Sequence, residues 1–363
     1  MKHGLVIGKF YPPHAGHHLL IRTAASACDA VTVIVMAADH ESIPLATRIR
    51  WLQEEHASEA NVVVTGIEDN LRMDLDDPEI WAGHVEIMKR ALARIGAKPV
   101  SAVFSSETYG AELARRFGAL PVMVDVGRTL APISATQVRA DLVANWHHLA
   151  PAVRAGMAVR VVVVGAESSG TTTLAAALTD HWRTLGGAHG LTRCVPEYGR
   201  AYTAQKWANA RAAAQVEGRR PPAMEELEWK SAEFEHIARS QIAAEELAAR
   251  TGGPLLVCDT DAFATAIWHE RYMGRPSDEV MRLADSVHHA LYLVTDHADV
   301  PFEQDGLRDG ETIRPWMTQR FIAALQEARR PYVVLAGSRD DRLEQAIRAT
   351  SNVLENAWRL AAP

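Results

Sequence analysis

The sequence has few cysteines and no long apolar run, and each shortage excludes a class of protein. Its three cysteines, Cys28, Cys194 and Cys258, lie far apart among 363 residues, with no C-x-x-C spacing. This argues against a disulfide framework or a zinc-binding loop and indicates a reducing, cytoplasmic environment. No apolar run approaches the roughly 18 residues of a membrane helix, so we expect no membrane partner. The opening MKHGLVIGKF enters an apolar run directly, which leaves no room for a signal peptide.

The sequence also lacks an excess of positive charge. A net charge of −7 and an isoelectric point near 6.1 give no support to a nucleic-acid-binding surface. Small anionic ligands remain compatible with an acidic protein, because one site can be locally positive. A hydrophobic content of 48% and 363 residues are enough for two domains with a core each.

Short apolar runs rich in β-branched residues alternate with longer helical patterns. In the first half, strands are predicted at HGLVIG, AVTVIVMA, NVVVTGI, SAVFSS and LPVMVDV. The series of predicted strands restarts at Val159–Val164 and continues with TRCVPEY, GPLLVCDTD, HALYLVTD and PYVVLAG. This pattern predicts an α/β protein with two doubly wound parallel-sheet domains. We place the domains at residues 1–155 and 156–363, with Pro151 and Gly156 in the linker and a charged, helix-rich insertion over 205–250.

The strand at Val159–Val164 leads into GAESSGTTTL, which is almost a phosphate-binding loop. Gly165 to Gly170 fits G-x-x-x-x-G, but Thr171 stands where a lysine is expected. The backbone N–H groups and the helix N-terminus can still bind phosphate, and the Thr172 hydroxyl can bind Mg²⁺. The loop residues predicted to bind ATP are Gly165, Glu167, Ser168, Ser169, Gly170, Thr171, Thr172 and Thr173.

The first half carries a different pair of motifs. GKFYPPHAGH follows the first strand and contains Gly8, where the backbone can approach a ligand, and His14 and His17 at a helix start. PISATQVR follows a later strand, and its hydroxyls and Arg139 can hold phosphate. Together the motifs resemble the signatures G-x-F-x-P-x-H-x-G-H and I-S-x-T-x-x-R of the nucleotidyltransferase superfamily. The resemblance implies a Rossmann-like domain in which His14, His17 and Arg139 are catalytic and Gly8, Lys9, Phe10, Gly16, Ser134 and Thr136 bind ATP.

VFSSETYGAELA and VDVGRTLAPISATQVR extend this resemblance to the bifunctional NadR family over essentially the whole chain. It implies a nicotinamide mononucleotide adenylyltransferase domain, which makes NAD and pyrophosphate, followed by a P-loop ribosylnicotinamide kinase-like domain. ATP and Mg²⁺ are the implied cofactors, with nicotinamide mononucleotide, ribosylnicotinamide and NAD as partners. Ser106, Glu107 and Trp81 are candidate contacts to the mononucleotide, although a buried structural role for Trp81 is also open.

Thr171 is the departure from the family's lysine-containing loop. By analogy with other lost transition-state contacts, loss of the lysine should raise the activation free energy of phosphoryl transfer by about 3–4 kcal/mol if no other cation compensates. Arg308 and Arg314 lie in VPFEQDGLRDGETIRPW, which resembles the family's D-G-x-R region at Asp305, Gly306 and Arg308. We expect these arginines to supply the charge.

Acidic side chains follow two other strands of the second half. Glu197 and Asp261 are both candidates for the base that accepts the proton of the attacking hydroxyl, and Asp259 is a candidate metal and substrate ligand. Tyr198 and Arg200 are expected to contact the substrate. His147–His148 and His288–His289 are expected at the surface.

Two alternatives stay open at this point. One is an active adenylyltransferase joined to a kinase-dead P-loop domain, and the other is a non-catalytic sensor of NAD or ATP. Some relatives carry an N-terminal helix-turn-helix module, but this chain begins at the first strand, so we do not expect direct DNA repression. A homo-oligomer is left open.

Overall fold

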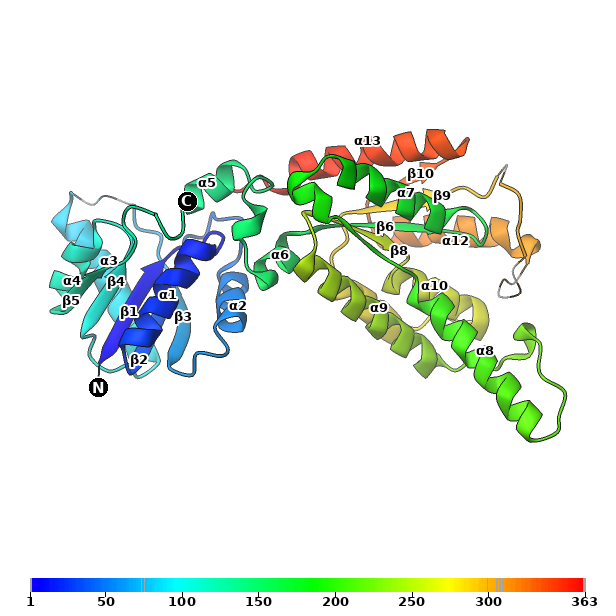
Figure 1. Cartoon of the computed structure of the whole chain (residues 1–363), viewed down its shortest axis with the longest axis horizontal. Coiled ribbons are helices and arrows are strands. Elements are labelled where there is room, and N and C mark those ends of the chain that lie inside the picture. The colour runs from blue at the N-terminus through cyan, green and yellow to red at the C-terminus, as the bar shows by residue number, and fades with distance from the viewer. Residues whose placement is uncertain are drawn as a thin grey trace. The chain divides into compact units, whose positions relative to one another are not determined.

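The computed structural model describes residues 2–72, 74, 76–298, 300–304, 306, 308 and 310–361, and Asp305 lies outside them. The chain folds into two compact units (Figure 1). Unit 1 runs to Arg154 and takes in the chain again from Trp358, whereas unit 2 is Ala155–Ala357.

Unit 1 alternates strands and helices along the chain. Its elements are β1 (His3–Gly8), α1 (Ala15–Ala27), β2 (Ala30–Ala37), α2 (Leu45–Glu55), β3 (Val62–Glu68), α3 (Pro78–Arg94), β4 (Ala102–Ser105), α4 (Gly110–Phe117), β5 (Leu120–Met123), α5 (Ala135–Ala140) and a 3-10 turn at Trp146–His148. The five strands form one parallel sheet in the order β3-β2-β1-β4-β5. Successive connections leave β1 and β4 in opposite directions, so the crevice between the carboxyl ends of these two strands is the expected ligand position.

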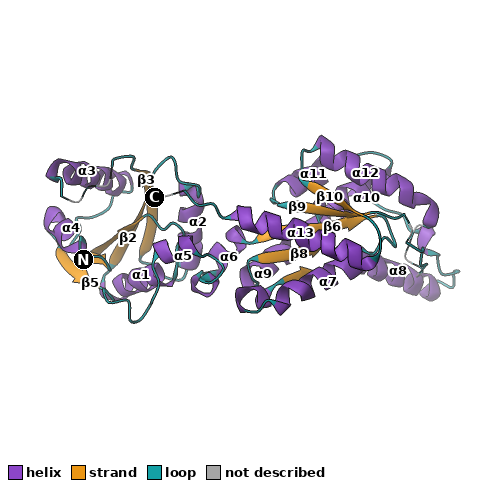
Figure 2. Cartoon of the chain, turned by 90° about the horizontal axis from the view of Figure 1, so that it is seen from above, coloured by secondary structure: helices purple, strands orange, loops and turns teal. Residues whose placement is uncertain are grey.

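Both faces of this sheet are covered, which explains its continuous apolar strands. One apolar cluster joins α1 and α2 to the sheet through residues such as Ile21 and Leu52. The opposite cluster joins α3 and α4 through residues such as Met88 and Leu113. Figure 2 shows these helices on the two sides of the strands.

Unit 2 repeats the architecture with a longer insertion. Its elements are β6 (Val159–Gly165), α7 (Thr171–Thr184), β7 (Arg193–Val195), α8 (Tyr198–Val216), α9 (Ser231–Thr251), β8 (Leu255–Asp259), α10 (Ala262–Met273), α11 (Asp278–Asp285), β9 (Leu291–Thr295), α12 (Arg314–Glu327), β10 (Tyr332–Leu335) and α13 (Arg339–Ala357), with 3-10 turns at Gly187–Leu191, Met224–Glu226 and Glu311–Ile313. Helix α6 (Pro151–Met157) precedes β6.

The sheet of unit 2 is also parallel, in the order β10-β9-β6-β8-β7. Its core packs α9, α10 and α12 on one face through Phe234, Phe263 and Phe321. Strands β8 and β9 are buried at every residue. The predicted fold class, two doubly wound parallel-sheet units, is therefore confirmed.

The strand predicted over LPVMVDV is shorter than expected, because β5 ends at Met123. Asp125 adopts a left-handed conformation with a φ of 48°. Its carboxylate accepts hydrogen bonds from the N–H groups of Thr129, Leu130 and Ala131 and thereby forms a turn. The alternating pattern continues into this segment, but the side-chain hydrogen bonds replace the strand ladder.

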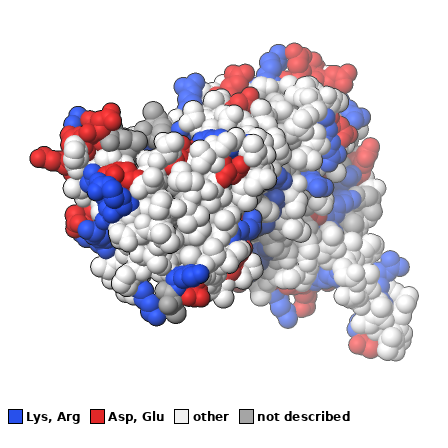
Figure 3. Space-filling view, turned by 60° about the vertical axis from the view of Figure 1, so that its left-hand side comes forward, with Lys and Arg blue, Asp and Glu red and all other residues white. Residues whose placement is uncertain are grey.

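Within the described residues, we find no helix that is both long and apolar enough to cross a membrane. On the face shown in Figure 3, acidic and basic side chains are interspersed among a larger number of uncharged residues.

Candidate functional site

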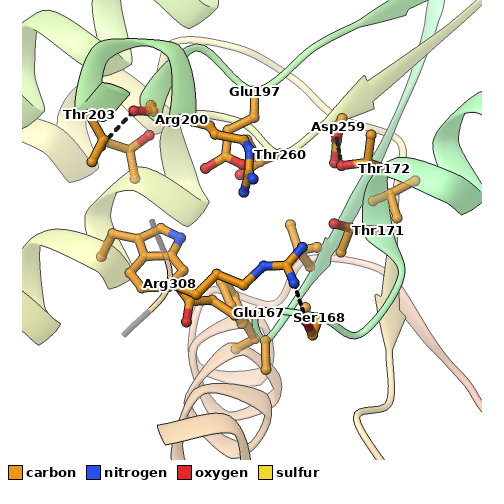
Figure 4. A pocket seen from close by; sticks show the side chains of 18 of the residues that line it. Glu167, Ser168, Thr171, Thr172, Glu197, Arg200, Thr203, Asp259, Thr260 and Arg308 are labelled. Atoms are coloured by element: carbon orange, nitrogen blue, oxygen red, sulfur yellow. Dashed lines mark hydrogen bonds between the residues drawn. The ribbon is translucent and has the colours of Figure 1, made fainter. Parts of the chain in front are cut away.

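A cavity of about 380 Å³ lies at the carboxyl ends of the unit 2 strands (Figure 4). The glycine loop between β6 and α7 forms one side of it, and residues that follow β7 and β8 form the other. The predicted residues that line it are Gly165, Glu167, Ser168, Gly170, Thr171, Thr172, Thr173, Glu197, Arg200, Asp259 and Arg308. The structure thus brings most of the predicted unit 2 site into one place.

The glycine loop requires glycine at two positions. A Cβ atom on Gly165 would lie 2.2 Å from the Thr295 Oγ1 and 2.5 Å from the Ser169 Oγ, so no side chain fits there. Gly170 has a φ of 90° and precedes the first turn of α7. Ser169 is buried, and its hydroxyl contacts the Thr295 hydroxyl at 2.6 Å, so it supports the loop from beneath.

Thr172 and Asp259 form the central polar pair of the cavity. The Thr172 hydroxyl donates to Asp259 Oδ2 at 2.6 Å, and Thr171 also hydrogen-bonds this carboxyl. Burial raises the pKa of Asp259, against the opposing effect of these hydroxyls and of Arg200. A hydroxyl and a poorly solvated carboxylate beside the loop are oxygen ligands of the type that Mg²⁺ prefers, so the residues fit this ion.

Glu197 faces Asp259 across the cavity (Figure 4). Burial raises the pKa of Glu197 to about 7, with a further contribution from the charge of Asp259. Arg200, in the first turn of α8, lowers the pKa of both carboxyls but does not cancel the effect of burial. A carboxyl with a pKa near neutrality can accept a proton at physiological pH.

The two predicted loop arginines have different surroundings. Arg308 lies beside the glycine loop, where its guanidinium donates to the Ser168 hydroxyl at 2.6 Å and to the Glu303 carbonyl (Figure 4). Arg314 is buried, and it donates to the carbonyls of His297 and Val300 at 2.7 and 2.8 Å. Arg314 is not among the described residues that line the cavity, so its position favours a structural role.

Asp261 and Tyr198 also lie outside the described lining of the cavity. Asp261 caps α10 by accepting from the Ala264 N–H at 2.9 Å, and it accepts from the Tyr292 hydroxyl at 2.7 Å. The Tyr198 hydroxyl contacts His236 at 3.2 Å. Of the two predicted bases, the structure therefore favours Glu197.

An aromatic wall that was not predicted from the sequence completes the cavity. Its members come from three helices and the segment before α9: Trp229, Phe234, Trp268, Tyr272 and Phe321. Trp268 and Tyr272 stack with their ring centroids 6.1 Å apart, and Trp229 lies 5.2 Å from Tyr272. The four-residue spacing of Trp268 and Tyr272 on one helix was a signal available in the sequence.

In unit 1, His14 and His17 lie together at the start of α1, with ring centroids 3.7 Å apart. The Nδ1 of His14 accepts from the Gly16 N–H, and the Nδ1 of His17 accepts from the His14 N–H, both at 3.2 Å. Burial lowers the pKa of His14 to about 3 and that of His17 well below its usual value, helped by neighbouring positive groups. Both rings are therefore neutral with the proton on Nε2, where it can be donated to a ligand.

The second motif approaches the first through Arg139. Its guanidinium donates to the Tyr11 carbonyl at 3.0 Å and to the Thr136 hydroxyl at 3.3 Å. Ser134 caps α5 by accepting from the Gln137 N–H. The two predicted motifs, 128 residues apart at this contact, therefore meet in unit 1.

Lys9 has an ion-pair partner that was not predicted from the sequence. Its Nζ lies 2.9 Å from Glu41, whose other oxygen lies 2.6 Å from Arg48. The side chains of Glu41 and Arg48 are fully buried, and Arg48 also donates to the Lys9 carbonyl at 3.0 Å. This ion network fixes the loop after β1. A Cβ atom on Gly8, in the same loop, would lie 3.3 Å from the Phe10 ring, and Phe10 has a φ of 47°.

A second cavity, of about 520 Å³, adjoins this loop through Gly8 and Lys9. Trp81, Tyr109 and His84 also line it, and a hydrogen bond from His84 to Asp69 holds the His84 ring. Trp81 is buried in the core as well as lining the cavity, so both predicted roles agree with its position.

The two other predicted contacts follow β4. Glu107 forms an ion pair with Arg128 at 2.5 Å, and Ser106 is its partly exposed neighbour. Neither residue is among those described as lining the second cavity.

The glycine loop, the hydroxyl–carboxylate pair and the parallel sheet define unit 2 as a P-loop nucleotide-binding unit. The chain belongs to the AAA domain family, whose model matches residues 160–342.

Comparison with curated proteins confirms the resemblance to the NadR family. The chain is 24% identical over 318 residues to the "Trifunctional NAD biosynthesis/regulator protein NadR" of Escherichia coli (strain K12), which covers 84% of this chain and 71% of that protein. The protein of the same name from Salmonella typhimurium (strain LT2) matches to the same extent.

Two solved structures share the fold. A NadR protein in complex with NR superposes with a TM-score of 0.70 at 22% identity and covers 97% of this chain and 96% of that chain. A NadR protein in complex with NAD and AMP-PNP gives a TM-score of 0.65 at 23% identity, with 98% and 96% covered.

Proposed function

We propose that the chain is a two-site enzyme of NAD salvage. Unit 2 phosphorylates ribosylnicotinamide with ATP, and unit 1 transfers AMP from ATP to the resulting nicotinamide mononucleotide. The names of the curated relatives and the ligands of the two similar structures support the substrate classes. The observation that carries the kinase assignment is the single cavity that joins the glycine loop, the Thr172–Asp259 pair and Glu197.

In the kinase reaction, the backbone N–H groups of the glycine loop bind the phosphates at the N-terminus of α7. Thr172 and Asp259 would hold Mg²⁺, which when bound would supply charge neutralisation for the transferring phosphoryl group. Glu197 accepts the proton of the attacking hydroxyl, since a neutral alcohol is a poor nucleophile. Arg308, held against the loop by Ser168, supplies the cation that Thr171 cannot.

The aromatic wall gives a physical reason for a pyridine substrate. The ring of ribosylnicotinamide carries a positive charge, and aromatic faces attract cations by roughly 0.5–2 kcal/mol each. Glu197 and Asp259 add negative charge to the same cavity. A neutral nucleoside would lose both contributions, so the cavity favours the cationic ring.

In the adenylyltransferase reaction, His14 and His17 donate hydrogen bonds from Nε2 to the triphosphate without carrying charge. Arg139, with Ser134 and Thr136, holds the departing pyrophosphate, and catalysis is positioning together with charge stabilisation. We place the nicotinamide end of the mononucleotide in the second cavity, where Trp81 and Tyr109 supply aromatic faces. Lys9 contributes less than an unpaired lysine would, because Glu41 neutralises it.

We further propose a cytoplasmic location, since the free cysteines suit a reducing compartment.

One coupled assay tests both activities. The full chain is given ribosylnicotinamide, ATP and Mg²⁺, and the mononucleotide and NAD are followed by chromatography. Both products should appear. NAD formed from supplied mononucleotide, without phosphorylation of ribosylnicotinamide, would leave an adenylyltransferase with a silent P-loop unit. Formation of neither product would contradict the enzyme assignment and favour a sensor.

A further inference from the structure

Unit 2 holds a second group of polar side chains, outside the nucleotide cavity. Glu245 comes from α9, Cys258 from β8 and His289 from the segment before β9, and all three are buried. One ligand atom from each lies within 4.8 Å of the others. The sequence-based prediction of His289 at the surface is wrong: only 3% of the residue is exposed, because the segment turns inward before the buried strand β9.

The contacts of His289 place oxygen acceptors beside both ring nitrogens. The Nε2 of His289 lies 2.8 Å from Glu245 Oε2, while its Nδ1 lies 3.4 Å from Asp261 Oδ2 and 3.3 Å from the Tyr292 hydroxyl. With its proton on Nδ1, a neutral ring would turn the unprotonated Nε2 toward the Glu245 carboxylate. A further proton or a metal cation can then lie between these two groups.

Glu245 favours the metal over the proton. Its side chain is fully buried, and its second oxygen, Oε1, has no hydrogen-bond partner in the described part of the chain. An unsatisfied buried carboxylate oxygen is rare and costly. A proton shared with His289 satisfies only one of the two oxygens. A cation bound by both carboxylate oxygens would satisfy Oε1 as well, and it would also engage the sulfur of Cys258.

We propose that Glu245, Cys258 and His289 form a binding site for one divalent transition-metal ion, of which Zn²⁺ is the best match. An imidazole nitrogen, a thiolate and a carboxylate are all ligands of this ion. Asp261 and Tyr292 act as positioning residues, because they hold Nδ1 and so direct Nε2 toward the ion. Tyr292 is fixed in turn, since its hydroxyl donates to Asp261 at 2.7 Å and accepts from Arg330 at 2.8 Å.

Metal binding at this site requires no oxidation or reduction, only the loss of protons from the ligands. The Cys258 thiol loses its proton when the sulfur–metal bond forms, and the proton shared by His289 and Glu245 is displaced. About two protons per ion should therefore enter the solvent. Zinc–ligand bonds of roughly 2.0–2.3 Å place ligand atoms about 3.5 Å apart, so the widest separation must close by about 1 Å.

The site adjoins the nucleotide cavity through β8, whose last residue, Asp259, lines that cavity. The ion would tie α9, β8 and the segment before β9 together. Cys258 directly precedes Asp259, and successive side chains of a strand point to opposite faces. Metal binding on one face of β8 would therefore fix the residue that contacts Thr172 on the other.

Co²⁺ and Zn²⁺ are the probes for the test on the full chain. The metal-free protein should take up one equivalent of Zn²⁺ in competition with a chromophoric chelator and release about two protons, read with a pH indicator. Co²⁺ should give a sulfur-to-metal charge-transfer band. Cys258→Ser should abolish this band, whereas the control Cys194→Ser, at a half-buried thiol in β7, should retain it.

Tyr292→Phe should weaken Zn²⁺ binding by roughly 10–100-fold, as expected for a positioning residue. The wild-type measurement needs no variant, so a poorly folded Cys258→Ser does not weaken the test. Absence of a stoichiometric ion in the wild type, or a charge-transfer band that survives in Cys258→Ser, overturns the proposal and leaves a proton shared between His289 and Glu245.

Discussion

The Thr172 hydroxyl donates a hydrogen bond of 2.6 Å to Asp259, and this contact joins the helix after the glycine loop to the end of a neighbouring strand. The pair marks the place where a metal-bound phosphate would lie. Because Thr172 and Asp259 are 87 residues apart, their contact also shows that the sheet, and not a local motif, assembles the kinase site.

Thr172→Val should lower the kinase rate by about 10²–10³, because the substitution removes the hydroxyl but keeps the shape. The measurement is the initial rate of ribosylnicotinamide phosphorylation. Thr172→Ser is the matched control and should retain most of the rate, and adenylyl transfer by unit 1 should be unchanged in both. Equal losses in the serine and valine variants would contradict a role for the hydroxyl.

Glu197 should give the kinase a pH dependence. Its pKa of about 7 means that the carboxylate becomes available as pH rises through neutrality, so kcat should increase and then level off above that pH. Glu197→Gln should lose this dependence and lower kcat by about 10²–10⁴.

The raised pKa of Glu197 also makes the stability of the folded protein depend on pH. The folded protein keeps the Glu197 proton to higher pH than the unfolded chain, so this group's contribution to stability falls as pH rises from the unfolded value to about 7. Relative to wild type, Glu197→Gln should gain up to about 3 kcal/mol between pH 4 and pH 8, less any screening by water in the cavity. Urea unfolding at the two pH values measures this difference, and an unchanged difference would show that Glu197 titrates normally.

Arg308 should replace the missing lysine of the loop. Arg308→Ala should lower the kinase rate by about 10²-fold or more, whereas Thr171→Lys should raise the wild-type rate only slightly. Single-turnover kinetics would measure both. Arg314→Ala is the contrasting variant: its guanidinium holds two backbone carbonyls, so it should mainly lower the melting temperature. A hundredfold gain in Thr171→Lys would show that Arg308 does not compensate.

His14 should stay neutral throughout the physiological range. With a pKa of about 3, its ring should show no titration between pH 5 and 8 in nitrogen-resolved NMR, with the proton on Nε2. His14→Ala should lower the adenylyltransferase rate by about 10²–10³, because one neutral donor to the triphosphate is lost, and should leave kinase activity intact. A titration near pH 6.5 would contradict the proposed donor role.

Glu41→Gln should destabilise unit 1. The substitution leaves the fully buried guanidinium of Arg48 without its carboxylate, which costs about 3–5 kcal/mol. Glu59→Gln is the control, since its pair with Arg22 is partly exposed and is worth about 1 kcal/mol or less. Chemical unfolding compares the two variants, and equal losses would show that burial of the Glu41 network has no special cost.

The features that could be predicted from the sequence are those that depend on short, continuous stretches of residues. Strands covered on both faces must be apolar throughout, so the alternation of strands and helices could be predicted from apolar runs. The family resemblance rested on short motifs. The glycines of the P-loop were readable for the same reason, because a Cβ at Gly165 would collide with two hydroxyls.

The features that it missed depend on contacts between distant segments. The aromatic wall is drawn from separate helices, and Glu41 acquires its role only when the loop after β1 folds against it. The choice between Glu197 and Asp261 was undecidable for the same reason. Each follows a strand, and only the folded chain reveals that Asp261 accepts from the distant Tyr292 hydroxyl whereas Glu197 lines the cavity.

The return of the chain to unit 1 at Trp358 has a consequence for biosynthesis. Trp358 packs near Trp146, with ring centroids 6.4 Å apart, and the Ala361 N–H donates to the Ser42 hydroxyl at 3.0 Å. The first half of the polypeptide therefore leaves the ribosome before some of its own packing partners have been translated. Its last native contacts must wait until more than two hundred further residues have emerged, so a nascent chain interrupted after Arg154 would lack the packing of Trp358 near the Trp146 indole.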